Sequence, residues 1–185
     1  MPLLQSHKIL GCYAQTELGH GSNVAMLETT ATLDKTTDEF IIHSPTTTST
    51  KFWPGDLGRY STHAAVYARL LIESKDYGVH CFIVQLRDLK TYKHLRGVRT
   101  GDIGPKLGYH AKDNGWAIFD KVRIPRTNML MAMANVEKDG KFNLIGDMRV
   151  LYATMMLIRT RIVFSMNTHM FAACNIALRY AAVRR

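Results

Sequence analysis

Residues 12–23 gather small residues, hydroxyls and two glycines between two apolar-rich stretches of the chain. Gly19 and Gly21 allow backbone amides to approach a ligand closely, because glycine carries no side chain. Thr16 and Ser22 supply hydroxyls that hydrogen-bond ring carbonyls or phosphate oxygens without adding charge. This composition suits a flat, anionic cofactor, and it also occurs in ordinary turns that connect two strands.

The spacing of these glycines is not that of a dinucleotide-binding fingerprint. No third glycine follows Gly21 at the required offset, and no long helical pattern begins there. The loop therefore indicates a ligand site only in combination with features elsewhere in the chain.

Composition predicts a folded chain with an anionic ligand or partner. The 185 residues are 46% hydrophobic and 21% charged, which is ordinary for globular proteins and sufficient for one compact domain with a helical annex. The net charge is +9, but the arginines are interspersed with apolar residues and no zinc-finger or RNA-recognition signature occurs. We therefore expect no nucleic acid as a partner.

Cysteine and histidine usage predicts no metal site and a reducing compartment. Cys12, Cys81 and Cys174 are too few and too scattered for a disulfide framework or a metal motif, and we expect them to be small core residues. The histidines form no pair at metal-ligand spacing with a supporting carboxylate. We expect no leader and no membrane span, because no apolar run is long enough.

Hydrophobic periodicity predicts an α+β fold in which strands come first and helices last. Residues 29–33 and 40–43 flank a polar turn and predict a hairpin, and residues 63–72, 79–86 and 116–124 predict further strands. Strands at this spacing form an antiparallel sandwich or barrel. Beyond Asn128 the period changes, and Met155, Ile158 and Ile162 recur at helical spacing, which predicts a long helix or a helical pair.

Several motifs stand in register along nearly the whole chain. They are Gly11 to Gly21, Leu27-Glu28-Thr29-Thr30-Ala31-Thr32, Ser44-Pro45-Thr46, Lys51-Phe52-Trp53-Pro54-Gly55-Asp56-Leu57-Gly58, Gly101-Asp102-Ile103-Gly104-Pro105-Lys106, Asp113-Asn114-Gly115, Val122 to Leu130 and Arg179 to Arg185. With these motifs the chain resembles the peroxisomal acyl-CoA oxidases, flavoenzymes related to the acyl-CoA dehydrogenases. The resemblance implies that residues 1–130 are the middle β-domain and that residues 131–185 begin a truncated helical bundle.

The resemblance also implies the chemistry. Members of this family bind FAD and a fatty acyl-CoA, remove hydrogens from its α and β carbons to give a 2-enoyl-CoA, and reduce O2 to H2O2. It implies fatty acid β-oxidation in the peroxisome, although the chain ends in Val183-Arg184-Arg185 rather than a Ser-Lys-Leu tripeptide. The loop and the Trp-Pro-Gly motif favour an oxidase over a dehydrogenase that passes electrons to another flavoprotein. Partners implied are a second copy or a full-length oxidase.

Five residues of the β-region correspond to cofactor contacts in the family. Thr16 would bond the polar edge of the isoalloxazine, Gly21 would belong to the cofactor-binding loop, and Ser22 would lie near the flavin pyrophosphate or the acyl-CoA. Trp53 would lie against the flavin, and Gly55 would leave space near N5 for oxygen. From the residues alone, the hydroxyls could instead cap a turn and Trp53 could be core.

Arg184 corresponds to an arginine that family members present to FAD phosphates across a dimer interface. Guanidinium suits that task through bidentate, permanently charged contacts. An arginine at this position could equally be a solvated helix-end residue.

The catalytic base implied by the family is a glutamate downstream of residue 185, so we expect no catalytic residue within this chain. Glu17 and Glu28 lie close to the predicted flavin loop, but nothing in the sequence directs either of them at a substrate α carbon. The expectation is therefore FAD and acyl-CoA binding without turnover. The alternative is a non-catalytic interaction or regulatory subunit built on the same β-domain.

Overall fold

Strands make up most of the first part of the chain, and one long helix makes up the last part. The computed structural model describes residues 5–147 and 149–184, and it contains two compact units, Met1–Asn143 and Leu144–Arg185. The strand β10 (Ala134–Val136) lies beyond residue 130 and within the first unit. The sequence-based boundary at residue 130 stays a prediction about domain organisation.

A six-stranded sheet forms the larger part of the first unit. Its strands are β1 (Gly11–Ala14), β2 (Thr30–Asp34), β3 (Glu39–His43), β5 (His63–Ile72), β6 (Lys75–Gln85) and β9 (Val122–Pro125). The order is β1-β5-β2-β3-β9, with β6 also paired to β5. The predicted antiparallel arrangement is correct except at β5, where β1 and β2 both pair in parallel.

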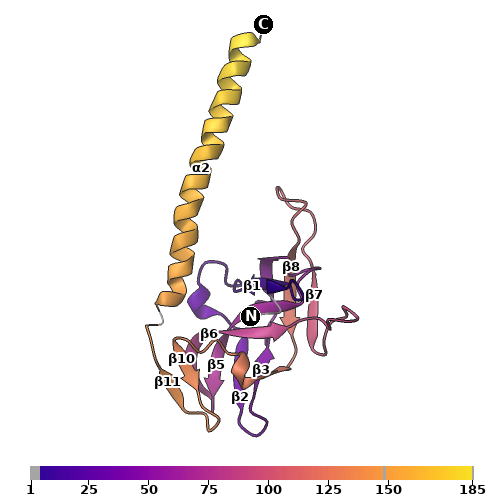
Figure 1. Ribbon diagram of the computed structural model, residues 1–185, viewed down its shortest axis with the longest axis vertical. Helices are drawn as coiled ribbons and strands as arrows, with labels where there is room; N and C mark the ends of the chain where they lie inside the picture. The colour runs from indigo at the N-terminus through magenta and orange to yellow at the C-terminus, as the bar shows by residue number, and fades with distance from the viewer. Residues whose placement is uncertain (1–4, 148, 185) are drawn as a thin grey trace. The chain divides into compact units, whose positions relative to one another are not determined.

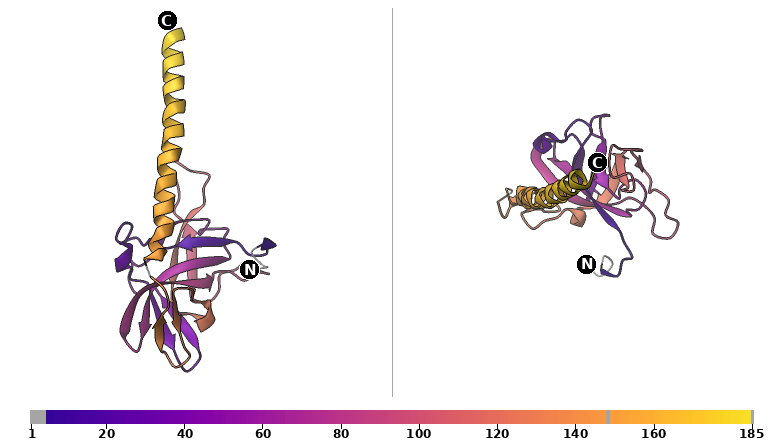
Figure 2. Two further views of the ribbon diagram at one scale, coloured as in Figure 1. Left: turned by 60° about the vertical axis from the view of Figure 1, so that its left-hand side comes forward. Right: turned by 90° about the horizontal axis from the view of Figure 1, so that it is seen from above.

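A three-stranded sheet, β4-β8-β7, contains β4 (Lys51–Gly55), β7 (Val98–Asp102) and β8 (Asn114–Phe119). A small ribbon of β10 and β11 (Phe142–Leu144), with the 3-10 turns η1 (Val24–Met26) and η2 (Arg126–Asn128), completes the strand-rich part. The strands curl into a half-barrel (Figures 1 and 2). Two hydrogen bonds between Ser44 and Phe119 connect the end of β3 to β8.

The core is built by strict alternation along the strands. Every second residue of β5 is buried, as expected for a strand with one face against the core. Phe40 of β3 and Phe82 of β6 are fully buried, and their rings meet edge-to-face with centroids 5.1 Å apart. The sandwich or barrel prediction is therefore confirmed by the side chains that fill its interior.

The predicted hairpin is present, and the strand predicted over residues 79–86 has a shifted boundary. β2 and β3 pair antiparallel around the polar turn, as predicted. β6 begins at Lys75 rather than at residue 79, because Glu73 and Ser74 both have positive φ and form a two-residue turn. Turns of this type match the twist of the flanking strands, so pairing continues to the turn.

The predicted single strand over residues 116–124 is wrong. It is divided into β8 and β9, which belong to different sheets. Lys121 has φ of 50° and makes the turn at which the chain leaves one sheet for the other. Periodicity did not indicate this break because both strands are apolar and only two residues separate them.

The second unit contains one continuous helix, α2 (Val150–Val183), rather than a helical pair. Large apolar side chains are exposed along it, among them Val163, Phe164, Phe171 and Val183. Exposed apolar side chains in such numbers normally mark a surface that another element covers. Within the part of the chain that the structure describes, no helix is both long enough and apolar enough to cross a membrane.

The cysteines differ in their surroundings more than the sequence predicted. Cys81 is buried and Cys12 is half-buried, but Cys174 is exposed on α2 and is not a core residue. Burial is the main reason why the pKa values of Cys12 and Cys81 are raised to about 11.

We therefore expect iodoacetamide at pH 8 to alkylate Cys174 first. At that pH a thiol with a pKa near 11 is thiolate to only roughly one part in a thousand, and the thiolate is the reactive form. Mass spectrometry of the labelled peptides checks this order, with Cys174→Ser as the control that removes the fast phase. Fast labelling of Cys12 or Cys81 would contradict the burial of these two thiols.

Candidate functional site

The loop that follows β1 is held along the segment that leads into β4. Phe52 N donates to Thr16 O at 3.1 Å, Leu18 N donates to Thr50 O at 2.8 Å, and Gly19 N donates to Thr48 O at 2.9 Å. These hydrogen bonds give the loop a strand-like course beside residues 48–52. The structure thus brings Thr16 next to the Phe52-Trp53 pair, although 36 positions separate Thr16 from Phe52.

Thr16 is fixed by its hydroxyl. Thr16 Oγ1 donates to Phe52 O at 2.6 Å, so its proton is used within the chain and its lone pairs remain as acceptors. Gly21 and Ser22 lie further along the loop and are exposed. A Cβ added to Gly21 would meet nothing within 4 Å, which leaves open space at this position.

Trp53 and Gly55 lie on β4, at a bulge in its pairing with β8. Trp53 has a positive φ of 84°, which is rare for a bulky residue, and its side chain is 54% exposed. Asn114 Nδ2 donates to Trp53 O at 2.7 Å and holds the bulge. The space above Gly55 is bordered by Lys112, whose Cε would lie 2.8 Å from an added Cβ.

A cavity of about 410 Å³ lies beside the exposed indole of Trp53. Its lining residues come from β4, from the β7–β8 loop and from the start of β8, and they are Trp53, Lys106, Leu107, Gly108, Tyr109, Lys112 and Asn114. Lys112 is paired with Asp56, at 2.6 Å between Nζ and Oδ2. The cavity combines aromatic surface with cations, which is suitable for a flat anionic ligand.

A buried ion pair lies directly behind the loop. Lys51 Nζ is 3.0 Å from Glu17 Oε1, and both side chains are fully buried. Lys51 also donates to Gln15 O at 3.1 Å and to Tyr67 O at 2.6 Å. Glu17 accepts further hydrogen bonds from Glu28 N at 2.7 Å and from Thr29 N at 2.9 Å and Oγ1 at 2.6 Å.

The pKa values of Lys51 and Glu17 are shifted by burial and by the attraction between the two groups. Burial lowers the pKa of Lys51 to about 8, against the attraction of Glu17. Burial by itself raises the pKa of Glu17, but Lys51 and the hydrogen bonds from Glu28 and Thr29 together hold it below its ordinary value. At neutral pH both groups are charged and fully hydrogen-bonded, which is the condition for keeping charges inside a protein.

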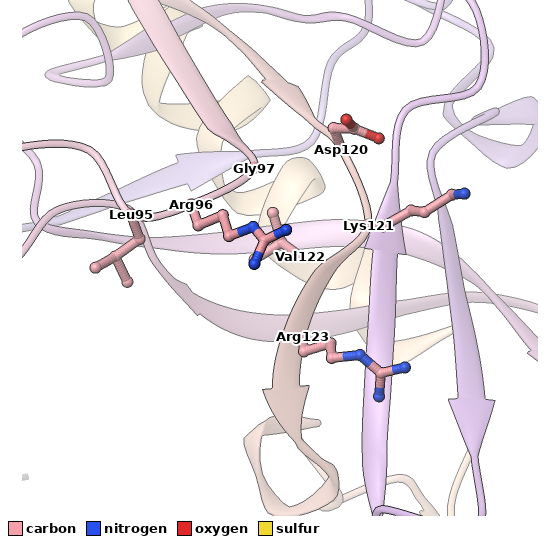
Figure 3. Close-up of a pocket in the computed structure, with 7 residues that line it drawn as sticks. All are labelled: Leu95, Arg96, Gly97, Asp120, Lys121, Val122 and Arg123. Atoms are coloured by element: carbon pink, nitrogen blue, oxygen red, sulfur yellow. The ribbon is translucent and has the colours of Figure 1, made fainter.

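A second cavity, of about 600 Å³, lies between the turn at Asp120 and the segment before β7 (Figure 3). It is lined by Leu95, Arg96, Gly97, Asp120, Lys121, Val122 and Arg123. Arg123 is committed to Asp34 at 3.0 Å and Glu39 at 2.9 Å. The Trp53 cavity is the better candidate site, because it contains the exposed indole of Trp53 on the same strand as Gly55.

Arg184 belongs to the second unit, apart from the unit that contains Thr16 and Trp53. It ends α2, where its backbone N–H donates to Tyr180 O at 2.9 Å, and its guanidinium lies 5.9 Å from the centre of the Tyr180 ring. Its contact with a phosphate stays a prediction.

Each glutamate in the sequence is engaged by another group within the chain. Glu28 accepts hydrogen bonds from Thr46 and Thr48, and these bonds are the main reason why its pKa is lowered. Glu39, Glu73 and Glu137 contact Arg123, Lys35 and Asn143, respectively. Within residues 5–147 and 149–184, no group of three His, Cys, Asp or Glu side chains is arranged to hold a metal ion.

Lys51 is the residue of this region whose position the sequence did not reveal. A lysine that opens an apolar run ordinarily points to solvent, because full burial of an amine is costly. The available signal was the coincidence of one lysine beside Phe52-Trp53 with one acidic residue, Glu17, inside the glycine-containing loop.

Comparison with known proteins gives a consistent result. The family model of the acyl-CoA dehydrogenase middle domain matches residues 12–122. The putative peroxisomal acyl-coenzyme A oxidase 1.2 of Arabidopsis thaliana is 53% identical over 190 aligned positions, which include 100% of this chain and 28% of that protein.

Solved structures agree over the whole chain. An acyl-CoA oxidase from Lycopersicon esculentum (tomato) is 57% identical with a TM-score of 0.94, covering 100% of this chain and 29% of its own. Acyl-CoA oxidase-2 of Caenorhabditis elegans, bound with FAD, ascaroside-CoA and ATP, is 47% identical with a TM-score of 0.94, covering 100% of this chain and 28% of its own. This chain thus spans less than a third of the length of these relatives. It belongs to the acyl-CoA dehydrogenase middle-domain family and, within it, to the acyl-CoA oxidases.

Proposed function

We propose that this chain forms the β-domain wall of the FAD and acyl-CoA site of a peroxisomal acyl-CoA oxidase. The observation that carries this proposal is the match of 100% of the chain, at a TM-score of 0.94, to a relative whose structure holds FAD and ascaroside-CoA. Relatives are named as peroxisomal enzymes, which supports the compartment. In this proposal residues 1–130 are the middle domain and residues 131–185 begin the helical one.

The residues around the loop fit a flavin by their chemistry. Trp53 offers an exposed aromatic face, and Thr16 offers only acceptor lone pairs, which suits an N–H on the edge of a ring. Open space at Gly21 allows close approach of a pyrophosphate to the backbone, with the exposed Ser22 hydroxyl beside it. Arg184 would contact an FAD phosphate across a dimer interface.

The role proposed for each group follows from its chemistry. Bound FAD would supply the acceptor for the β hydride of the fatty acyl-CoA and pass the electrons to O2, giving H2O2 and a 2-enoyl-CoA. Trp53 and Thr16 would orient the ring, and Gly55 would border it. Glu17 and Glu28 are poor candidates for removing the α proton, because hydrogen bonds already occupy their oxygens and their pKa values are lowered. We therefore infer binding without turnover by these 185 residues alone.

We expect the purified chain, mixed with excess FAD and freed of unbound cofactor by gel filtration, to keep a bound-flavin visible spectrum. Trp53→Ala should weaken FAD binding about tenfold, because one aromatic stacking contact is worth roughly 1–3 kcal/mol. Leu89→Ala, which shortens another half-exposed apolar side chain, is the matched control and should bind FAD like the wild type. Turnover of palmitoyl-CoA by this chain alone would contradict the proposal that the base for the α proton lies outside these residues.

A second candidate function, association with a second copy or with a full-length oxidase, is favoured by the helix α2. Its exposed apolar side chains, such as Phe164, Phe171 and Ile176, are of the kind that marks an interface. Analytical ultracentrifugation separates the two cases. A monomer that stays soluble at high concentration argues against the interaction role, whereas a stable dimer without flavin favours it.

A further inference from the structure

The buried pair of Glu17 and Lys51 connects four segments that are distant in the sequence. Lys51 opens β4 and donates to the loop at Gln15 and Glu17 and to β5 at Tyr67. Glu17 accepts from the backbone and the hydroxyl that precede β2, at Glu28 and Thr29. The loop, β4, β5 and the start of β2 are thus joined at one point.

Two of the candidate flavin-contacting residues lie close to this pair in the sequence, Thr16 directly before Glu17 and Trp53 two positions after Lys51. Thr16 precedes Glu17, and its hydroxyl bonds to Phe52, which follows Lys51. Trp53 comes next on β4, where the positive φ leaves its indole exposed. Any shift of the loop relative to β4 would therefore change the position of the Thr16 hydroxyl with respect to the indole.

We propose that Glu17 and Lys51 are positioning residues for the flavin site, which hold Thr16 and Trp53 in the geometry that binds the cofactor. This inference rests on the proposed function, because it concerns the same site. Neither side chain touches the cofactor, since both are fully buried behind the loop. Preorganisation of contacting groups by a buried, hydrogen-bonded support is the physical basis of the effect.

The protonation of Lys51 can be changed by changing the pH. Its pKa of about 8 is within the working range, so the ion pair is present below pH 8 and is lost as the pH rises through that value. The titratable side chains that interact with Lys51 are Glu17 and Cys81 of β6, and its ammonium also donates to the backbone carbonyl of Tyr67 on β5. Glu17 has a lowered pKa, Cys81 titrates near 11, and burial raises the pKa of Tyr67 well above its ordinary value. Among these groups the pKa of Lys51 lies nearest to pH 8, and His20→Gln checks the histidine 3.4 Å from Glu17.

The experiment compares the wild type with Glu17→Gln and with Val136→Ala. Glu17→Gln keeps the shape and an acceptor oxygen but removes the charge, and Val136→Ala truncates a fully buried side chain of β10. FAD affinity is measured by flavin fluorescence between about pH 6.5 and 9, on either side of the Lys51 pKa, and thermal unfolding is recorded in parallel. Hydrogen exchange of peptides covering residues 15–23 reports the loop without any cofactor.

We expect the wild type to lose FAD affinity about tenfold as the pH rises through about 8, the equivalent of one charge-assisted hydrogen bond. Glu17→Gln should bind weakly at every pH, without that step, and its loop should exchange faster than that of the wild type. Val136→Ala should keep wild-type affinity and the pH step despite a lower melting temperature. This last result separates positioning from general stability.

Three outcomes overturn the inference, and a fourth concerns only the proposed function. Wild-type affinity in Glu17→Gln, or a pH step that persists in it, removes the positioning role. Equal hydrogen exchange of the loop in Glu17→Gln and in the wild type also removes the positioning role, and this measurement needs no flavin. If the wild type binds no FAD but the loop still loosens in Glu17→Gln and above pH 8, the positioning of the loop holds and the flavin assignment fails. The pH dependence of FAD affinity and of loop exchange in the wild type is measured without any variant. It therefore tests the inference even if Glu17→Gln does not fold.

Discussion

Lys51→Met is expected to lower the free energy of unfolding by about 3–5 kcal/mol, the range measured when one partner of a buried ion pair is removed. The reason is that Glu17 would remain charged and fully buried, without its cation. Methionine fills nearly the same volume, so the loss reports charge and hydrogen bonding rather than a cavity. Urea denaturation at neutral pH measures it.

The matched control is Lys112→Met, which breaks an exposed ion pair with Asp56. Exposed pairs contribute about 0–1 kcal/mol, so this variant should unfold almost like the wild type. The double variant Glu17→Gln with Lys51→Met should recover part of the loss, because no unpaired charge remains. Equal stability of Lys51→Met and Lys112→Met would show that the pair is hydrated in solution.

The pH dependence of this loss follows from Glu17. The pKa of Glu17 in the folded wild type is lowered from its ordinary value of 4.5. The stability that Glu17 contributes is therefore present above pH 4.5 and is lost as the pH falls through the lowered pKa. In Lys51→Met, burial without a cation raises the pKa of Glu17, so the carboxyl takes up a proton more readily in the folded state. Both effects should narrow the difference in stability between the variant and the wild type as the pH falls toward about 4.

Gly115→Ala is expected to cost about 3 kcal/mol of the free energy of unfolding, at the upper end of the usual range for overpacking. A Cβ at Gly115 would lie 2.5 Å from Gly58 Cα and 2.8 Å from the Leu57 carbonyl carbon. Both are backbone atoms of a buried segment, so no side chain can rotate away. The clash would push β8 from the chain that follows Trp53 and Gly55, and FAD binding should weaken as well.

Gly108→Ala is the matched control for this prediction. Gly108 has no neighbour within 4 Å of an added Cβ and no positive φ, so the same chemical change should be neutral or slightly stabilising. Thermal and urea unfolding of both variants provide the comparison. A melting temperature for Gly115→Ala close to that for Gly108→Ala would contradict the backbone contact between β8 and Gly58.

Much of the β-domain could be predicted because its local signals agree with one another. The alternation over residues 63–72 and the polar turn between β2 and β3 each report a short-range preference, and the structure has both elements where the pattern indicated. The motifs from Gly11 to Arg185 are sufficient to indicate the family, because several motifs in register are far more specific than one. The helix α2 followed from its helical period.

The periodicity of the sequence does not report which segments meet in space. The division of residues 116–124 between two sheets depends on a turn of only two residues, and the parallel pairing of β5 with β1 and β2 depends on which strands meet in space. The same is true of the candidate site. Thr16 and Trp53 could be proposed from the family resemblance, but the approach of Thr16 to Phe52 across 36 positions is made by hydrogen bonds between the loop and β4.

Periodicity, turn residues and motif order were sufficient to indicate the family, the class of fold, the strands β2, β3, β5 and β6 and the final helix. The burial of Lys51 against Glu17 and the exposure of Trp53 became visible only in the folded chain. The physical reason is that burial of a charge depends on partners brought from distant segments, and no local pattern records whether such partners arrive.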